Sequence, residues 1–134
     1  MARVRSRHTS PELSLRRALH AAGLRYRLHG RLPGSPDIVL SKARLAIFVH
    51  GCFWHSHPAC KRARTPSTRQ DYWIPKLARN VERDRSSIAA LEGLGWRVIV
   101  VWECETKGDR LFEHVQEIAS ASRAMADQKC FPLR

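Results

Sequence analysis

An eleven-residue stretch from His50 to Cys60 holds the side chains of this sequence that are best suited to chemistry. It contains three of the seven histidines, two of the four cysteines and two large aromatic residues. Cys52, His57 and Cys60 have the spacing C-x4-H-x2-C, and Cys104 follows downstream. Three thiolates and one imidazole are the ligand set of a closed structural zinc site. We therefore expect zinc at these four residues, and buried cysteines without a metal are the alternative.

Two histidines of the same stretch, His50 and His55, stay outside that ligand set and need a different role. Asp84 falls on the apolar stripe of an expected helix, where a carboxylate is costly unless it is paired. A histidine partner would be oriented and made more basic by the carboxylate, as a general base for a water nucleophile requires. An ion pair with Arg83 or Arg85 is the alternative for this carboxylate.

Two further carboxylates, Asp37 and Glu12, also occupy informative positions. Asp37 opens an expected strand and His50 ends the next one, so neighbouring strands would bring both to one edge of a sheet. A carboxylate at that place is a natural ligand for Mg²⁺, although an Asp after Pro36 can also simply cap a turn. Glu12 lies on the apolar stripe of the first expected helix, where an acid also favours the helix dipole without any catalytic role.

The charge of the chain indicates a polyanionic partner. Lys and Arg number 24 against 12 acidic residues, which gives a formal net charge of +12. Such a balance favours nucleic acid ahead of an anionic membrane, and a basic protein without such a partner is the alternative. Phe53 and Trp54 lie between expected metal ligands, and Trp73 lies in a segment rich in cations. Aromatic side chains on a rigid loop suit wedging between bases, whereas a small core beneath the loop is the competing interpretation.

The patterning of apolar residues predicts the elements that position these side chains. Helices are expected over residues 10–22, from about 72 or 75 to 94, and over 109–126; strands over 25–28, 37–40, 43–50 and 96–102; and a long ordered loop over 51–71. Ser10 is the expected N-cap of the first helix. Ile74 and Phe112 are expected to face inward, and the strand over 96–102 is expected to be central. This order predicts an α/β fold with a small mixed sheet and helices against it.

The length and hydropathy of the chain set its organisation. At 134 residues it is expected to form one domain, 1–134, with a core of about residues 3–126 and a loose tail over 127–134. No apolar run approaches the roughly 18 residues of a membrane span, and no signal peptide is recognised. We expect a cytoplasmic protein without membrane contact, in which clustered cysteines bind metal rather than form disulfides. Cys130 has no obvious partner.

Taken together, these residues resemble the very short patch repair (Vsr) DNA mismatch endonuclease family. The matching segments run in family order: RSRHTSPE at 5–12, LPGSPD at 32–37, FVHGCFWH at 48–55, TRQDYW at 68–73, Lys76 with NVERDR at 80–85, and LGWRV at 94–98 through VWEC at 101–104. They cover roughly residues 3–105. The HGCFWH block with a distant WEC is highly specific.

The resemblance implies a restriction-endonuclease-like fold with a zinc-stapled loop. It also implies Mg²⁺-dependent nicking of double-stranded DNA on the 5′ side of the thymine in a T·G mismatch, which arises when 5-methylcytosine deaminates. The implied catalytic set is Asp37 and the main-chain carbonyl of Val49 for Mg²⁺, His55 with Asp84 for activating water, His50 for the scissile phosphate and Glu12 for supporting a water on the metal. The implied zinc ligands are Cys52, His57, Cys60 and Cys104, and the implied intercalating wedge is Phe53, Trp54 and Trp73.

Some features depart from the family pattern. Val49 stands where some relatives carry Thr, the spacing from His57 to Cys60 is one residue shorter in others, and nothing after Cys104 matches. The lysine of the usual nuclease motif is absent, with histidine in its place. We expect a monomer acting near the nucleoid, with contacts to other repair proteins left open. The alternative functions are a zinc-stapled nuclease or DNA-binding module with relaxed or different mismatch or structure specificity, and a purely structural interaction protein is least favoured.

Overall fold

The computed structural model describes residues 9–28 and 31–130, the last seven of these by their backbone alone. Its helices are α1 (Ser10–Ala21), α2 (Gln70–Gly93) and α3 (Gly108–Cys130), its strands are β1 (Arg27–Leu28), β2 (Ile38–Leu40), β3 (Leu45–His50) and β4 (Arg97–Trp102), and two 3₁₀ turns are η1 (Lys61–Ala63) and η2 (Glu103–Glu105). The α/β class expected from the sequence is confirmed. Within the described ranges, no helix is long and apolar enough to cross a membrane.

The four strands form one mixed sheet in the order β1-β2-β3-β4. β1 and β2, and β2 and β3, pair antiparallel, whereas β3 and β4 are parallel and are connected through α2. The parallel register places His50 opposite Trp102. The loop after β3 and the 3₁₀ turn after β4 therefore leave the sheet at the same edge, which brings together residues that are about fifty positions apart in the sequence.

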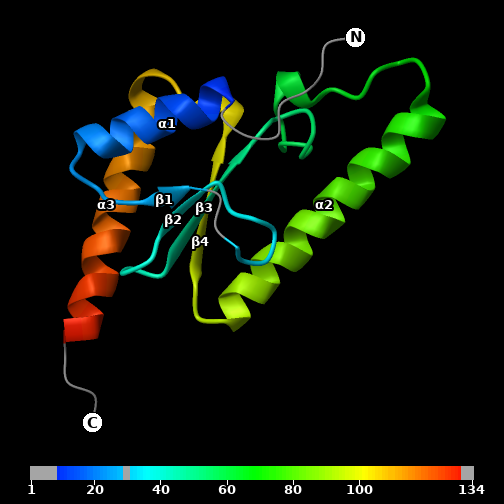
Figure 1. Cartoon of the computed structure of the whole chain (residues 1–134). Coiled ribbons are helices and arrows are strands. Elements are labelled where there is room, and N and C mark those ends of the chain that lie inside the picture. The colour runs from blue at the N-terminus through cyan, green and yellow to red at the C-terminus, as the bar shows by residue number, and fades with distance from the viewer. Residues whose placement is uncertain (1–8, 29–30, 131–134) are drawn as a thin grey trace.

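Helices cover both faces of the sheet, with α1 and α3 on one side and α2 on the other (Figure 1). Leu15 of α1 and Ile118 of α3 pack with Ile47 of β3 in the larger core cluster. Phe48, the next residue of β3, packs instead with Leu91 of α2. Successive side chains of a strand point to opposite faces, so β3 is apolar on both. The sequence expectation of a strand covered on both faces is confirmed.

β4 corrects one expectation, because it is the last strand in the sheet order rather than a central one. Its sequence is still almost entirely apolar since both of its faces are covered: Val101 belongs to the core under α1 and α3, and Val98 packs in the cluster under α2. Apolarity on two faces reports covering helices. It does not report a partner strand on each edge.

Two helix ends also differ from the sequence expectation. The N-cap of α1 is Thr9 rather than Ser10, because the Thr9 hydroxyl accepts a hydrogen bond from the Glu12 N–H at 3.4 Å. An N-cap side chain accepts from an N–H two or three residues further on, and Thr9 lies three residues before Glu12. α3 continues to Cys130, so residues 127–130 are helical where a loose tail was expected, and residues 131–134 lie outside the described ranges.

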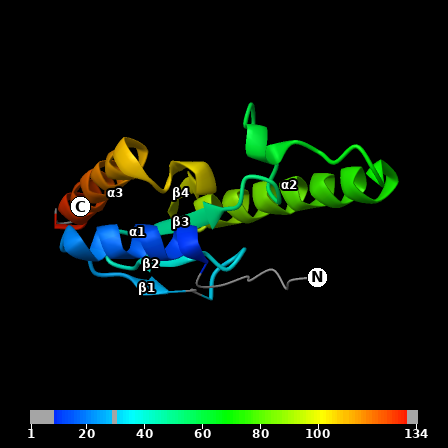
Figure 2. The same ribbon diagram turned by 90° about the horizontal axis from the view of Figure 1, so that it is seen from above.

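Two apolar side chains expected to face inward are exposed: Ile74 by 55% and Phe112 by 63%. The N-terminal half of α2 extends past the end of the sheet, so Ile74 has no strand to pack on (Figure 2). In α3 the buried stripe follows Val115 and Ile118, and the helical turn places Phe112 outside it. Leu77 and Leu91 of α2 are buried as expected.

Candidate functional site

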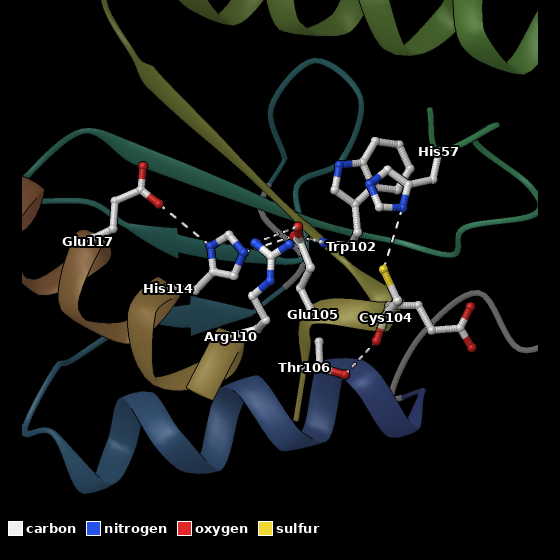
Figure 3. A network of polar contacts seen from close by, with 9 residues as sticks. His57, Trp102, Cys104, Glu105, Thr106, Arg110, His114 and Glu117 are labelled. Carbon is white, nitrogen blue, oxygen red and sulfur yellow. Dashed lines mark hydrogen bonds and ion pairs between the residues drawn. The ribbon is translucent and has the colours of Figure 1, made fainter. Parts of the chain in front are cut away.

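Four metal-binding side chains meet where β3 and β4 leave the sheet. Cys52, His57, Cys60 and Cys104 place their donor atoms within 4.8 Å of one another. The Cys104 sulfur lies 3.5 Å from His57 Nδ1 (Figure 3). All three cysteines are free of disulfides. Three sulfurs and one nitrogen converging on one point fit a tetrahedral metal ion such as zinc.

The pKa values of two of the three thiols, those of Cys52 and Cys104, also fit a site that needs a dication. Burial raises the pKa of Cys52 to about 12, with the neighbouring Cys60 and Cys104 side chains adding to the rise. The pKa of Cys104 is raised as well, by burial and by the Cys60 thiol. Three thiolates cannot share so small a space without a compensating positive charge. A metal ion bound there would supply that charge and hold the cluster in its ionised form.

The ligands of this metal cluster are braced by residues that the sequence analysis did not single out. The Glu103 carboxylate accepts a hydrogen bond from the Cys52 N–H at 3.3 Å, and so ties the loop after β3 to the turn after β4. Glu105 caps the Trp102 N–H at 3.1 Å and lies 2.8 Å from His114 of α3 (Figure 3). The available signal was an acid three residues after Trp102, which is the spacing of a capping box.

Two of these contacts set orientations. Burial alone would raise the pKa of Glu105, but the Trp102 N–H and His114 outweigh it and the pKa is lowered, so this carboxylate stays ionised. The His57 ring stacks on the Trp102 ring, with centroids 4.2 Å apart and planes at 11°. That stack fixes the direction of the His57 nitrogen that faces Cys104. The end of β4 and the turn after it thus support the metal cluster in three ways. Cys104 is a ligand, the Trp102 ring stacks on His57, and Glu105 caps the Trp102 N–H.

A cavity of about 410 Å³ lies beside the metal cluster. Its lining includes Asp37, Val49, His50, His55 and Asp84, five of the six residues that the family resemblance placed at the catalytic centre. An Asp37 oxygen accepts a hydrogen bond from the Val49 N–H at 2.7 Å, and the Asp37 N–H donates to the Ile47 carbonyl at 3.0 Å. The carboxylate is therefore fixed against the end of β3. The expectation that Asp37 and His50 meet at one sheet edge agrees with this geometry.

His55 and Asp84 form the shortest contact in the cavity, with His55 Nδ1 2.6 Å from an Asp84 oxygen. An ionised carboxylate can only accept, so His55 donates through Nδ1 and its Nε2 is left with a free lone pair. Among the described residues, the ion pairs of Asp84 are to His55 and, at 4.0 Å, to His50. The histidine interpretation of Asp84 therefore holds, and the alternative pairing with Arg83 or Arg85 does not.

His50 is a neutral side chain in this setting. It is 6% exposed, and burial together with the neighbouring His55 lowers its pKa to about 3. Its Nδ1 has no hydrogen-bond partner among the described residues. The His50 and His55 rings are stacked, with centroids 3.9 Å apart and planes at 6°. His50 is thus available to bind a ligand group as a neutral hydrogen-bonding ring.

The same stacking argues against a metal ion that is held by His50 and His55 together. His50, His55 and Asp84 lie close enough together to be considered as a ligand set. A metal ion, however, lies in the plane of each imidazole that binds it. Two nearly parallel rings 3.9 Å apart cannot both direct an in-plane lone pair at one point. These three residues are better suited to moving a proton than to holding an ion.

Glu12, the sixth residue of the implied catalytic set, is not among the residues that line this cavity. It is 1% exposed on α1, and an oxygen of its carboxylate lies 3.5 Å from the Arg16 guanidinium. Its place on the apolar stripe of α1 was expected, and the structure gives this buried carboxylate a cationic partner one helical turn away.

An aromatic cluster lies at the end of α2 that projects past the sheet. The rings of Phe53, Trp54 and Trp73 contact one another with centroids 5.1 to 5.8 Å apart, and Tyr72 adds an edge-on contact at 5.0 Å. All three main members are partly exposed. The Asn80 side chain donates to the Trp54 carbonyl at 3.0 Å and fixes the loop to the helix. The aromatics therefore pack on each other beside the cavity, outside the two buried core clusters.

Comparison with known proteins places this geometry in a family. The model of the family described as DNA mismatch endonuclease Vsr matches residues 1–62. Over 106 residues the chain is 53% identical to the type II nicking enzyme V.XorIIP of Xanthomonas oryzae pv. oryzae. The aligned segment covers 78% of this chain and 77% of that protein. This chain belongs to the Vsr endonuclease family. The resemblance inferred from its motifs is confirmed, and it is a DNA endonuclease.

Further similarities agree with this Vsr assignment. Over 109 residues the chain is 45% identical to the DNA mismatch endonuclease Vsr of Escherichia coli, covering 81% of this chain and 69% of that one. The catalytic domain of the homing endonuclease I-Bth0305I has a similar fold, with a TM-score of 0.60 over 87% of this chain and 97% of that domain, at 21% identity. The expected mixed sheet flanked by helices is therefore a nuclease fold.

Proposed function

We propose that this Vsr-family protein is a Mg²⁺-dependent endonuclease that nicks one strand of duplex DNA, 5′ to the thymine of a T·G mismatch, in very short patch repair. The observation that carries the proposal is the convergence of Asp37, His50 and the His55–Asp84 pair on one cavity. The names of the relatives support it, because one is called a DNA mismatch endonuclease and another a nicking enzyme.

The residues at the end of β3 fit a magnesium ion. Asp37 offers a carboxylate oxygen, the type of ligand that Mg²⁺ prefers. The Val49 N–H points at Asp37, and the N–H and C=O of one strand residue point to the same side, so the Val49 carbonyl faces the same region. Bound there, Mg²⁺ would stabilise negative charge on the phosphate and lower the pKa of water.

His55 is the general base in this proposal. Asp84 holds the His55 ring with its Nδ1 proton directed at the carboxylate, so Nε2 takes the proton from the attacking water. Asp84 stabilises the imidazolium that forms. His50 stays neutral beside it and hydrogen-bonds the scissile phosphate. Glu12, to which the family resemblance assigns support of a water on the metal, remains a predicted participant that does not line the cavity.

Zinc is the metal proposed for the cluster of Cys52, His57, Cys60 and Cys104. Its role is structural, because three cysteines and a histidine fill all four tetrahedral positions and leave none for substrate. The cluster fastens the loop that carries Phe53 and Trp54 to the end of β4. These two side chains, with Trp73, would enter the base stack at the mismatch. A monomer acting on DNA in the cytoplasm is the state that we propose.

Cleavage assays on defined duplexes test the proposal. Purified protein with Mg²⁺ is incubated with duplexes that carry each of the possible mismatches and with a matched duplex, each strand labelled separately. The expected product is a single nick 5′ to the thymine of T·G. Nicking of other mismatches at comparable rates would favour the alternative of a nuclease with relaxed specificity. Tight, mismatch-dependent binding without any cleavage would favour the DNA-binding module.

A further inference from the structure

One cationic side chain faces the catalytic cavity and has no role in the proposed mechanism. In the part of the chain that the structure describes, Arg83 is the only arginine or lysine that lines this cavity. We propose that Arg83 is a further catalytic residue, whose guanidinium binds the non-bridging oxygens of the scissile phosphate. This inference rests on the proposed nuclease function and adds a residue to the same site.

The position of Arg83 on α2 supports this role. It precedes Asp84, the partner of His55. One turn of α2 therefore carries both the guanidinium and the carboxylate that holds the proposed general base. Arg83 is exposed, and among the described residues it makes no ion pair, unlike Arg16, Arg62 and Arg110. A long side chain that is not held by an acid is free to reach a ligand in the cavity.

The charges of the cavity create a need for such a group. Its lining contains two carboxylates, Asp37 and Asp84, and one guanidinium, that of Arg83. A phosphodiester brings another negative charge, and attack by water adds one more at the transition state. A single magnesium ion held beside Asp37 would contact the phosphate from one direction only. A guanidinium matches two phosphate oxygens with two parallel N–H donors, a geometry that is specific to arginine.

Arg85 offers a matched control on the same helix. It is also exposed, but it lines a neighbouring cavity of about 430 Å³, which shares His50, His55 and Asp84 with the first cavity and does not include Asp37. Substitutions at Arg83 and Arg85 therefore remove the same charge from helix positions two residues apart, and only one of them removes it from the cavity that contains Asp37. General effects of net charge on DNA binding cancel in this comparison.

The first measurement is single-turnover nicking of a T·G duplex with saturating protein and Mg²⁺. Arg83→Gln should lower the rate about 10²-fold, the loss typical of one donor that stabilises transition-state charge. Arg83→Lys, which retains the charge without the paired donors, should recover part of that loss. Arg85→Gln should nick within about 3-fold of the wild-type rate, since this exposed side chain does not line the cavity in which Asp37 would hold the metal and the phosphate. Zinc content and thermal unfolding of each variant show that the fold is intact.

The second measurement locates the contact by replacing the scissile phosphate with an uncharged methylphosphonate. Affinity for the T·G duplex is measured without added Mg²⁺ and without chelators, which would remove zinc. Wild type and Arg85→Gln should each lose about 10-fold in affinity on the modified duplex, the size of one charge-assisted hydrogen bond. Arg83→Gln should bind both duplexes with equal affinity, because the guanidinium that would contact the phosphate charge is already absent from this variant.

Two results would overturn the inference. One is nicking by Arg83→Gln within about 3-fold of wild type, the range expected of ordinary surface substitutions. The other is an additive loss: Arg83→Gln loses the same factor in affinity as the wild type does when the methylphosphonate duplex replaces the unmodified one. Absence of nicking by the wild-type protein itself would instead count against the proposed function. The two failures are therefore distinguishable.

Discussion

At the level of single residues, the direction of proton transfer in the proposed mechanism follows from one contact. The His55 ring lies 2.6 Å from Asp84 through Nδ1, so the ring is held in the tautomer whose Nε2 can accept a proton. His50 stacks on the other side of this ring and is kept neutral by burial. A neutral neighbour opposes protonation of His55 less than a charged one would, which lets His55 carry the proton transiently.

Asp37 is the residue whose removal should separate binding from catalysis. Asp37→Ala should abolish Mg²⁺-dependent nicking, a loss of about 10³-fold or more, because it removes a metal ligand worth several kcal/mol at the transition state. Binding to a T·G duplex should remain largely intact. Nicking and gel-shift assays on the same preparation measure both. Wild-type nicking by this variant would place the metal site elsewhere.

His55 and Asp84 should differ in the size of their effects. His55→Ala should lower nicking by roughly 10²–10⁴-fold, the usual contribution of a general base. Asp84→Asn should cost less, because the amide can still accept from His55 Nδ1 and only the charge that stabilises the imidazolium is lost. Single-turnover rates at one pH compare the two. A larger loss for Asp84→Asn would give the carboxylate a direct role, for example in metal binding.

At the scale of elements, the cavity depends on how the turn before β2 meets α2. Gly34 in that turn has φ +77°, and a Cβ built on it would lie 2.6 Å from the Ser87 Cβ on α2. Only glycine permits this approach, because any side chain would push the turn from the helix. Asp37 follows three residues later and Asp84 lies three residues before Ser87. The spacing of the two carboxylates is therefore set partly by this contact.

Gly34→Ala should consequently lower stability and nicking together. We expect a loss of about 1–3 kcal/mol in the free energy of unfolding from overpacking and backbone strain. Gly23→Ala is the matched control, because its φ of +81° imposes similar strain but nothing lies within 4 Å of the added Cβ. Chemical denaturation and nicking rates check both variants. Equal losses of nicking at the two positions would show that the contact with Ser87 does not position Asp37.

The loop between β3 and α2 should depend on its metal ion. Cys104→Ser should release the zinc and lower the melting temperature, because a structural metal contributes directly to folding free energy. Cys130→Ser leaves all four cluster residues in place and should retain one zinc per chain. Elemental analysis of reduced protein and thermal unfolding measure these outcomes. An absence of zinc from freshly purified wild-type protein would contradict the assignment.

At the scale of the whole molecule, charge and shape favour DNA. The net charge of +12 attracts phosphates without regard to sequence, and this attraction falls as salt rises. The N-terminal half of α2 projects beyond the end of the sheet (Figure 2). Tyr72 and Trp73 of the aromatic cluster belong to this half of the helix, where a duplex can reach them. We therefore expect affinity for DNA to come from the basic residues and discrimination of mismatched from matched duplexes to come from the aromatic cluster.

Trp54→Ala tests that separation. It should weaken binding to a T·G duplex more than binding to a matched duplex, because a mispair costs less to unstack and so rewards an inserted ring. Arg79→Gln, at an exposed position of α2, should weaken both alike and reduce the salt slope by about 1 if it contacts a phosphate. Titrations at several salt concentrations measure both effects. Equal losses on the two duplexes for Trp54→Ala would mean that this ring only supports the loop.

The family and the α/β class could be predicted from the sequence alone, and so could the sets of residues whose types suit metal binding and catalysis. These features are local: the C-x4-H-x2-C spacing, the HGCFWH block and the apolar stripes are each written in contiguous residues. A ligand set depends on side-chain type. A helix or strand depends on the period of its own apolar positions. Such signals can be interpreted before any long-range contact is known.

Only the tertiary structure decided which of these residues meet. Asp84 could have paired with arginine, and it is the packing of α2 on the sheet that brings it to His55, 29 positions away. The bracing of Cys52 by Glu103, the exposure of Ile74 and the division of Arg83 from Arg85 between two cavities follow from the same packing. The physical reason is that burial and distance depend on where an element ends relative to its neighbours, which no local pattern records.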